Sequence, residues 1–205
     1  AERDIVLKRL PVDLLPLGVW VAAHPHSLIL KRPVRSSFVG GKPPRDPDDS
    51  GTFLRDYNEN PYPFYDANNA YLMTRGFTDK RLPSKEKILG IEVGEDAKAY
   101  VVDALGNEFV LNDQVGGREL LVMKTANSPI RIFDRTLDHQ DQTLLIEIID
   151  GKITDRNTRS EWNVDGLAVA GPLAGERLDE VITTPAFWFA WSIFHPRSEI
   201  YPPSQ

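Results

Sequence analysis

The fold of this chain is indicated most directly by the stretch Thr143-Leu-Leu-Ile-Glu-Ile-Ile149-Asp150-Gly151-Lys152-Ile-Thr154. Two runs rich in β-branched residues flank an Asp-Gly pair. That pair favours the tight turn of an antiparallel hairpin, because both of its positions tolerate a positive φ angle. The pattern therefore predicts two paired strands, 143–149 and 152–154.

Similar apolar runs lie on both sides of this hairpin and are separated by turn residues at short intervals. Gly94-Glu95-Asp96 and Gly116-Gly117 are two of these separators. The further predicted strands are 88–93, 97–103, 108–111, 119–124, 130–134 and 166–170. Many short strands with Gly and Asp turns predict a mainly β fold, an antiparallel barrel or sandwich.

The C-terminal part of the chain changes to a helical pattern. Thr184 is a suitable N-cap with Pro185 at the first helical position, where its missing N–H costs nothing. The aromatic residues that follow cover much of the helix circumference, which predicts a buried C-terminal helix ending before His195-Pro196. A weaker N-terminal helix is predicted over 14–23.

Two segments at opposite ends of the chain share the pattern Trp-x-x-x-His-Pro-x-Ser. Residues 20–30 correspond to residues 191–201 at one fixed spacing. Such self-similarity indicates an internal repeat. Because the pattern is shared, His24 and His195 are expected to cap their helices rather than to act in catalysis.

The repeat divides the chain into three parts. Residues 1–35 are expected to be the tail of a preceding repeat, and residues 36–84 a loop-rich linker with a Pro-aromatic segment. Residues 85–205 are expected to form the β-rich domain with its closing helix. Trp20 and its apolar neighbours need a surface to pack on. One alternative is that the segment folds back on the β-rich domain; the predicted partner is a companion domain or subunit.

The composition limits the possible partners and chemistry. The net charge of −6 disfavours binding to nucleic acid, and no apolar run approaches the ~20 residues of a membrane helix, so membrane insertion is not expected. The chain contains no cysteine, which excludes thiol catalysis and disulfides within it. No phosphate cradle, nucleophile elbow or zinc motif occurs, and no cofactor is expected.

The candidates for acid–base chemistry are Asp134, Asp155 and Glu161 as the carboxylates, with Arg135 or Arg156 as the charge clamp. A catalytic pair would need two of these carboxyl groups to converge, with one pKa raised by burial or like charge. The alternative interpretation of the 155–175 segment is an Asp-capped turn, a buried Trp162 and a Gly-Pro corner.

Two weaker binding candidates remain: a set of aromatic residues and an acidic loop. Trp162, Tyr62 and Tyr65 are aromatic residues that could stack on a sugar or another ring, although the tyrosines could equally pin the long loop onto the sheet. A calcium loop is suggested by Asp46, Asp48, Ser50 and Asp56, but Tyr57 stands where the closing bidentate Glu would be needed.

A series of motifs carries a resemblance to a known family. The motifs are Leu82-Pro83, Asn112-Asp113-Gln-Val115-Gly116-Gly117, Phe133-Asp134-Arg135, Gly171-Pro-Leu-Ala-Gly175 and Phe187-Trp188-Phe189-Ala190-Trp191. Over residues 53–203 the chain resembles domain-of-unknown-function family 3179. That resemblance implies tandem units and frequent export.

In the first unit of that family, a Cys-Pro-Leu-Cys motif and a histidine are expected. Lys124 and Asn127 stand here where the cysteines would fall, and Asn107 or Glu108 stands near the histidine position. The resemblance therefore implies that this chain corresponds to the second, cysteine-free half of the tandem.

Together these observations favour a non-catalytic binding or assembly module. It would be an accessory subunit or lobe of a larger extracytoplasmic protein, periplasmic or secreted. The alternative is an acid–base hydrolase or lyase that acts on a small polar or glycan substrate through paired carboxylates.

Overall fold

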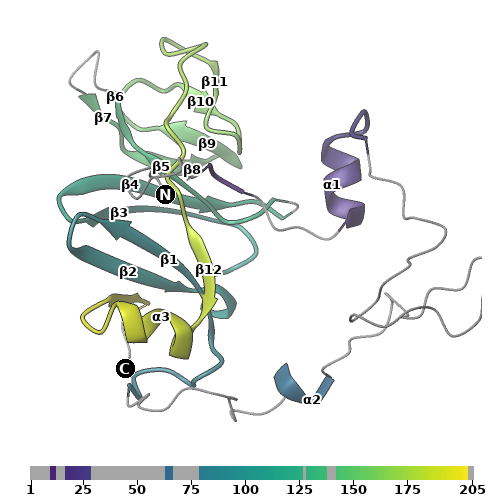
Figure 1. Cartoon of the computed structure of the whole chain (residues 1–205). Coiled ribbons are helices and arrows are strands. Elements are labelled where there is room, and N and C mark those ends of the chain that lie inside the picture. The colour runs from purple at the N-terminus through teal and green to yellow at the C-terminus, as the bar shows by residue number, and fades with distance from the viewer. Residues whose placement is uncertain are drawn as a thin grey trace, which may run out of the picture.

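The computed structural model describes residues 10–12, 17–28, 63–66, 79–126, 128–137 and 142–202 (Figure 1). Within these ranges the protein is rich in antiparallel strands, and a C-terminal helix followed by one short strand packs on them. The predicted fold class is confirmed: the sheets stay open, and their arrangement is sandwich-like rather than a closed barrel. None of the described helices is long and apolar enough to cross a membrane.

The first sheet has the strand order β12-β1-β2-β13. Strands β1 (Lys87–Val93) and β2 (Asp96–Val101) form an antiparallel hairpin. Strand β12 (Thr184–Phe187) pairs antiparallel with β1, and β13 (Glu199–Tyr201) pairs in parallel with β2. The C-terminal segment therefore closes both edges of the hairpin.

The second sheet, β3-β4-β5, lies next to the first (Figure 1). Strands β3 (Phe109–Val115) and β4 (Arg118–Lys124) are joined at Gly116 and Gly117, whose φ angles are 55° and 78°. Strand β5 (Arg131–Asp134) pairs with β4. A short 3₁₀ helix, η1 (Val102–Ala104), follows β2.

The third sheet has the order β11-β10-β9-β8. Strands β8 (Ile146–Ile149) and β9 (Lys152–Asp155) form the hairpin predicted at Asp150-Gly151, and both turn residues have positive φ, 51° and 76°. Strands β10 (Glu161–Trp162) and β11 (Ala168–Ala170) complete it. Strands β6 (Thr136–Leu137) and β7 (Gln142–Thr143) form a separate small ladder.

Strand β4 links the two larger hydrophobic clusters of the core. Its alternate residues point to opposite faces, as expected of a strand. Leu121 and Met123 join the cluster that contains Phe133 and Trp162, whereas Leu120 and Val122 join the cluster around Tyr100. All four side chains are almost fully buried, so β4 is a central strand of the sandwich.

The start of the C-terminal helix is a correction to the sequence prediction. Helix α3 spans Trp188–Phe194, and the predicted first turn at Thr184 and Pro185 is instead the edge strand β12. The N–H groups of Trp188 and Phe189, in the first turn of the helix, donate to the carbonyls of Glu86 and Ser84. Because the backbone before β1 satisfies these groups, the helix needs no side-chain cap.

Two short helices lie in the N-terminal third of the chain. Helix α1 spans Leu17–Ala23, within the predicted 14–23, and residues 13–16 lie outside the described ranges. Helix α2 spans Pro63–Asp66. Its Tyr65 places its ring 3.4 Å from the Lys85 ammonium and accepts a hydrogen bond from it through the backbone carbonyl.

Candidate functional site

Helix α3 is held on the first sheet by Trp191. This residue is 3% exposed and packs with Trp188, Ile88, Ala99 and Val101. Its indole N–H donates to the Ser198 hydroxyl at 2.9 Å. The ring lies so close to β1 that a Cβ atom at Gly90 would come within 2.4–2.6 Å of three of its carbons. Glycine is therefore required at position 90 for this close approach.

His195 caps the C-terminal end of α3 through its backbone. Its N–H donates to the Trp191 carbonyl at 3.0 Å, and its ring lies 4.0 Å from the Trp191 ring, centroid to centroid. The imidazole Nε2 is 3.6 Å from the Glu92 carboxylate. The backbone thus caps the helix, while the imidazole covers the indole.

Helix α1 carries the same set of internal contacts. The Trp20 indole donates to the Ser27 hydroxyl at 3.1 Å, and the His24 N–H donates to the Trp20 carbonyl at 2.8 Å. The two rings lie 4.2 Å apart. Both helices have seven residues, and each is followed by a turn in which the Ser N–H donates to the His carbonyl.

The two motifs differ in what covers them. Trp20 is only half-buried, and Leu17 and Val21 are 61% and 41% exposed. Their counterparts at the same spacing, Trp188 and Ser192, are 0% and 3% exposed. Among the residues that the structure describes, the first motif therefore has the internal structure of the second but no sheet beneath it.

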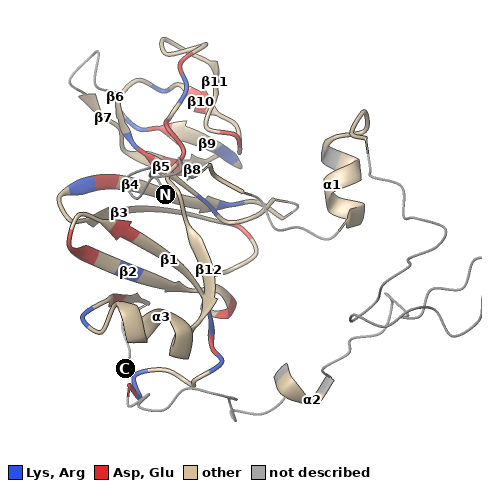
Figure 2. Cartoon of the chain, in the orientation of Figure 1, with Lys and Arg blue, Asp and Glu red and all other residues tan. Residues whose placement is uncertain are grey.

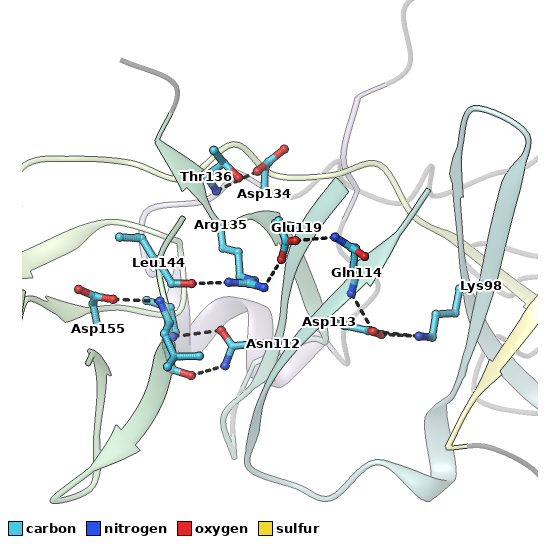
Figure 3. Close-up of polar contacts among 12 residues, drawn as sticks. Lys98, Asn112, Asp113, Gln114, Glu119, Asp134, Arg135, Thr136, Leu144 and Asp155 are labelled. Carbon is cyan, nitrogen blue, oxygen red and sulfur yellow. Dashed lines mark hydrogen bonds and ion pairs between the residues drawn. The ribbon is translucent and has the colours of Figure 1, made fainter. Parts of the chain in front are cut away.

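A polar network joins the second and third sheets (Figure 3). The Asn112 amide exchanges two hydrogen bonds with the backbone of Ile146, at 2.6 and 3.0 Å. Arg135 pairs with Glu119 and donates to the Leu144 carbonyl at 2.6 Å. Side chains from β3 and from the end of β5 thus hold segment 144–146, in the way that backbone pairing would.

The acid–base candidates have separate partners in the structure. Asp134 pairs with Arg118 at 2.7 Å. Glu161 pairs with Lys152 at 2.7 Å, and Arg156 contacts Glu147 at 3.4 Å with 62% of its side chain exposed.

Asp155 is fully buried and serves as a backbone acceptor. Its carboxylate accepts hydrogen bonds from the N–H groups of Leu145 at 3.0 Å and Thr158 at 2.7 Å. The Ser160 hydroxyl, also buried, accepts from the Leu173 N–H at 3.0 Å. These contacts describe a capped turn that fixes the ends of β9 and β10.

The aromatic and calcium candidates are placed as follows. Trp162 is 4% exposed and belongs to the core cluster around Phe133, so its ring offers no open face. Tyr65 covers Lys85 and lies 6.5 Å from the Phe187 ring. The remaining candidates lie outside the described residues: Tyr62, Asp46, Asp48, Ser50 and Asp56. Among the residues that are described, no three acidic or histidine side chains are grouped to hold a metal ion.

An open cleft of about 570 Å³ lies beside the C-terminal end of α3. It is bordered by the β1–β2 turn at Glu95, the β3–β4 turn at Gly116 and Gly117, and the turn from Phe194 to Glu199. None of the acid–base candidates lines this cleft. This cleft therefore does not bring a substrate to them.

Asp113 is the acceptor at the centre of a buried group between β2 and β3. It pairs with Lys98 at 2.9 Å and accepts the Tyr100 hydroxyl at 2.8 Å. Burial, together with the negative charge of Asp113, raises the pKa of Tyr100. Tyrosine in the unfolded chain ionises near pH 10, so this contribution to stability is complete below about pH 10 and is lost as the pH rises further.

We expect the free energy of unfolding to fall by about 1.4 kcal/mol per pH unit above about pH 10 through this residue. The Tyr100→Phe variant should lack that component, which denaturant unfolding between pH 8.5 and 11 would measure as a smaller alkaline slope. Tyr65→Phe is the matched control and should retain the wild-type slope. Equal slopes for Tyr100→Phe and the wild type would contradict the prediction.

Comparison with known proteins places these features in a family. No curated protein and no solved structure matches the chain. The family described as "Protein of unknown function (DUF3179)" matches residues 1–198. That range contains both Trp-His-Ser motifs and the polar network around Asn112 and Arg135. Because the match covers nearly the whole sequence, the chain belongs to the DUF3179 family.

Proposed function

We propose that this protein is a non-catalytic assembly module that binds a companion protein or lobe through residues 17–28, here called the α1 motif. The observation that carries the proposal is the contrast between two motifs with the same internal contacts. Trp191 is buried on a sheet, whereas Trp20 keeps its hydrogen bond and ring contact but is only half-buried. A motif of this kind gains stability when a surface covers it.

The chemistry of the α1 motif supports a protein partner. Residues 17–28 contain no Asp, Glu, Lys or Arg, and α1 carries no charged residue in Figure 2. Leu28 is 99% exposed, and Leu10 and Val12 nearby are 68% and 81% exposed. Burial of an apolar side chain contributes about 1.5–3 kcal/mol, so covering a few of these residues would support specific association.

The polar network supports the non-catalytic part of the proposal. The family motifs at 112–117 and 133–135 supply Asn112 and Arg135, which bond to the backbone of segment 144–146. Their side chains are thereby engaged in joining two sheets. We propose that the module works as an accessory subunit or lobe and, as the family resemblance implies, that it is exported.

The alternative function, an acid–base hydrolase or lyase, makes a distinct prediction. It needs two carboxyl groups that act on one substrate, and the partners of Asp134, Asp155 and Glu161 are different for each. Turnover of a small polar or glycan substrate by the purified chain, lost on the surface substitution Glu161→Gln, would favour the enzyme over the assembly module.

The assembly proposal predicts that a photo-reactive residue at position 28 cross-links a discrete partner in the native host. Leu28 suits this test because it is exposed and lies outside the Trp20–Ser27 contacts. We expect one dominant cross-linked protein, and at least a tenfold loss of it in the Trp20→Ala background. Val169, which is 54% exposed on β11, is the control position and should not capture the same protein.

Two outcomes would contradict the proposal. One is cross-linking from position 28 only to the chain's own residues. The other is a set of products that is the same from Val169 as from Leu28, or that Trp20→Ala leaves unchanged.

A further inference from the structure

We infer that the partner presents to the α1 motif an antiparallel β-hairpin with a glycine beneath the Trp20 ring, the same kind of surface that β1 and β2 present to α3. This inference rests on the proposed function and names the partner surface for it. The chain itself supplies the template, because α3, the second copy of the motif, packs on β1 and β2.

The template has three defining contacts. The Trp191 ring lies over Gly90 of β1, where no side chain could be accommodated without displacing the ring or the strand. Trp191 shares a buried cluster with apolar residues of both strands, Ile88, Ala99 and Val101. After the helix, Glu199 begins a short strand that runs parallel to β2 and pairs with Lys98.

The residues of the α3 segment have counterparts at the same spacing in the α1 motif. Trp20 is held by Ser27 as Trp191 is held by Ser198, so the indole is presented in the same way relative to the helix and the following turn. Val21 stands where the buried Ser192 stands, which makes the inner face of α1 more apolar than that of α3. Leu28 stands at the position where Glu199 begins β13.

These features favour one class of occupant. A tryptophan ring fixed at this angle needs a flat surface with a gap for the ring, and a strand glycine provides that gap without a cavity. The uncharged inner face matches the apolar strand residues of the template rather than a charged surface. The partner is therefore a β-unit with a glycine on its inner strand and a free edge on the neighbouring strand.

The position of the cross-link tests this inference separately from the proposed function. From position 28, the expected cross-link lies on a β-hairpin strand of the partner, next to a strand that contains a glycine. Substituting that partner glycine with valine should reduce the yield at least tenfold. A cross-link confined to a helix or loop of the partner would overturn the inference and leave the proposed assembly function standing.

A graft within the chain provides a second test that needs no partner. Residues 189–199 are replaced by residues 18–28, which keeps Trp188 and places the α1 sequence on β1 and β2. We expect cooperative unfolding with a melting temperature within about 10 °C of the wild type. The indole N–H at position 191 should remain protected from hydrogen exchange.

The single substitution Ser192→Val, made in the otherwise wild-type chain, is a milder form of this test. It changes one residue on the inner face of α3 to the valine that α1 has there. It should retain the protected indole N–H. Loss of that protection in Ser192→Val, or in a full graft that still folds, would show that the α1 sequence does not fit such a surface. A full graft that does not fold, combined with an unprotected indole in Ser192→Val, would overturn the inference as well.

Discussion

Replacing Trp191 with Ala is expected to lower the free energy of unfolding by about 3–5 kcal/mol, as for other buried tryptophans. Replacing Trp20 with Ala is expected to change it by less than about 1 kcal/mol, because this ring is only half-buried and its neighbours Leu17 and Val21 are exposed. The two residues make the same hydrogen bond to serine and the same contact with histidine. The difference therefore isolates the contribution of the sheet beneath Trp191.

Denaturant unfolding followed by far-ultraviolet circular dichroism measures this difference in the intact chain. Gly90→Ala provides an independent check of the same interface, because its Cβ would lie 2.4 Å from the Trp191 ring. We expect that substitution to destabilise the wild type by about 1–3 kcal/mol and the Trp191→Ala variant by much less. Similar losses for Trp20→Ala and Trp191→Ala would show that the α1 motif is already covered.

The hairpins could be predicted from the sequence because their signals are local. Asp150-Gly151 and Gly116-Gly117 specify turns by residue types that tolerate positive φ, and the structure has a hairpin at each. The predicted strand 97–103 proved shorter, because the 3₁₀ helix begins at Val102. That boundary depends on packing, which a local pattern does not encode.

The C-terminal segment from β12 to β13 could be predicted only in part, because its contacts are with residues distant in sequence. Pro185 indicated a helix start, yet it lies on edge strand β12 opposite Leu89, where a missing N–H is tolerated. The parallel pairing of β13 with β2 joins residues about one hundred positions apart, and a run of three residues gives no signal for it. Gly90 was a lone glycine in a strand, a sign of close approach whose partner only the structure reveals.

In the candidate site, too, local features could be predicted from the sequence and contacts between distant residues could not. The Trp-x-x-x-His-Pro-x-Ser pattern located both motifs, and the aromatic residues after Pro185 predicted that the C-terminal one is buried, but only the structure shows Gly90 against the Trp191 ring. The roles of Asn112, Glu119 and Arg135 depend on segment 144–146 reaching them from another sheet. Turn chemistry, by contrast, suggested a capping role for Asp155, and its two backbone hydrogen bonds are of that kind.

Replacing Asp155 with Ala is expected to lower the free energy of unfolding by about 2–4 kcal/mol, because two backbone N–H groups would lose their acceptor in a buried site. Asp155→Asn keeps one side-chain oxygen as an acceptor and should cost about half as much. Glu161→Gln is the control: its ion pair with Lys152 is solvent-exposed, so we expect a change below about 1 kcal/mol.

Chemical denaturation at pH 7 measures the free energy of unfolding of the three variants, and the order of the losses distinguishes a turn-capping carboxylate from a catalytic one. A catalytic carboxylate is commonly maintained at some cost to stability, so its neutral variants tend to be as stable as the wild type or more so. A turn-capping carboxylate has the opposite signature, with the largest loss for the variant that removes both acceptors. If Asp155→Ala were as stable as the wild type, the capping role would fail and the acid–base alternative would regain its most buried candidate. A loss graded from Ala to Asn would instead assign Asp155 to the architecture that holds β9 and β10 together.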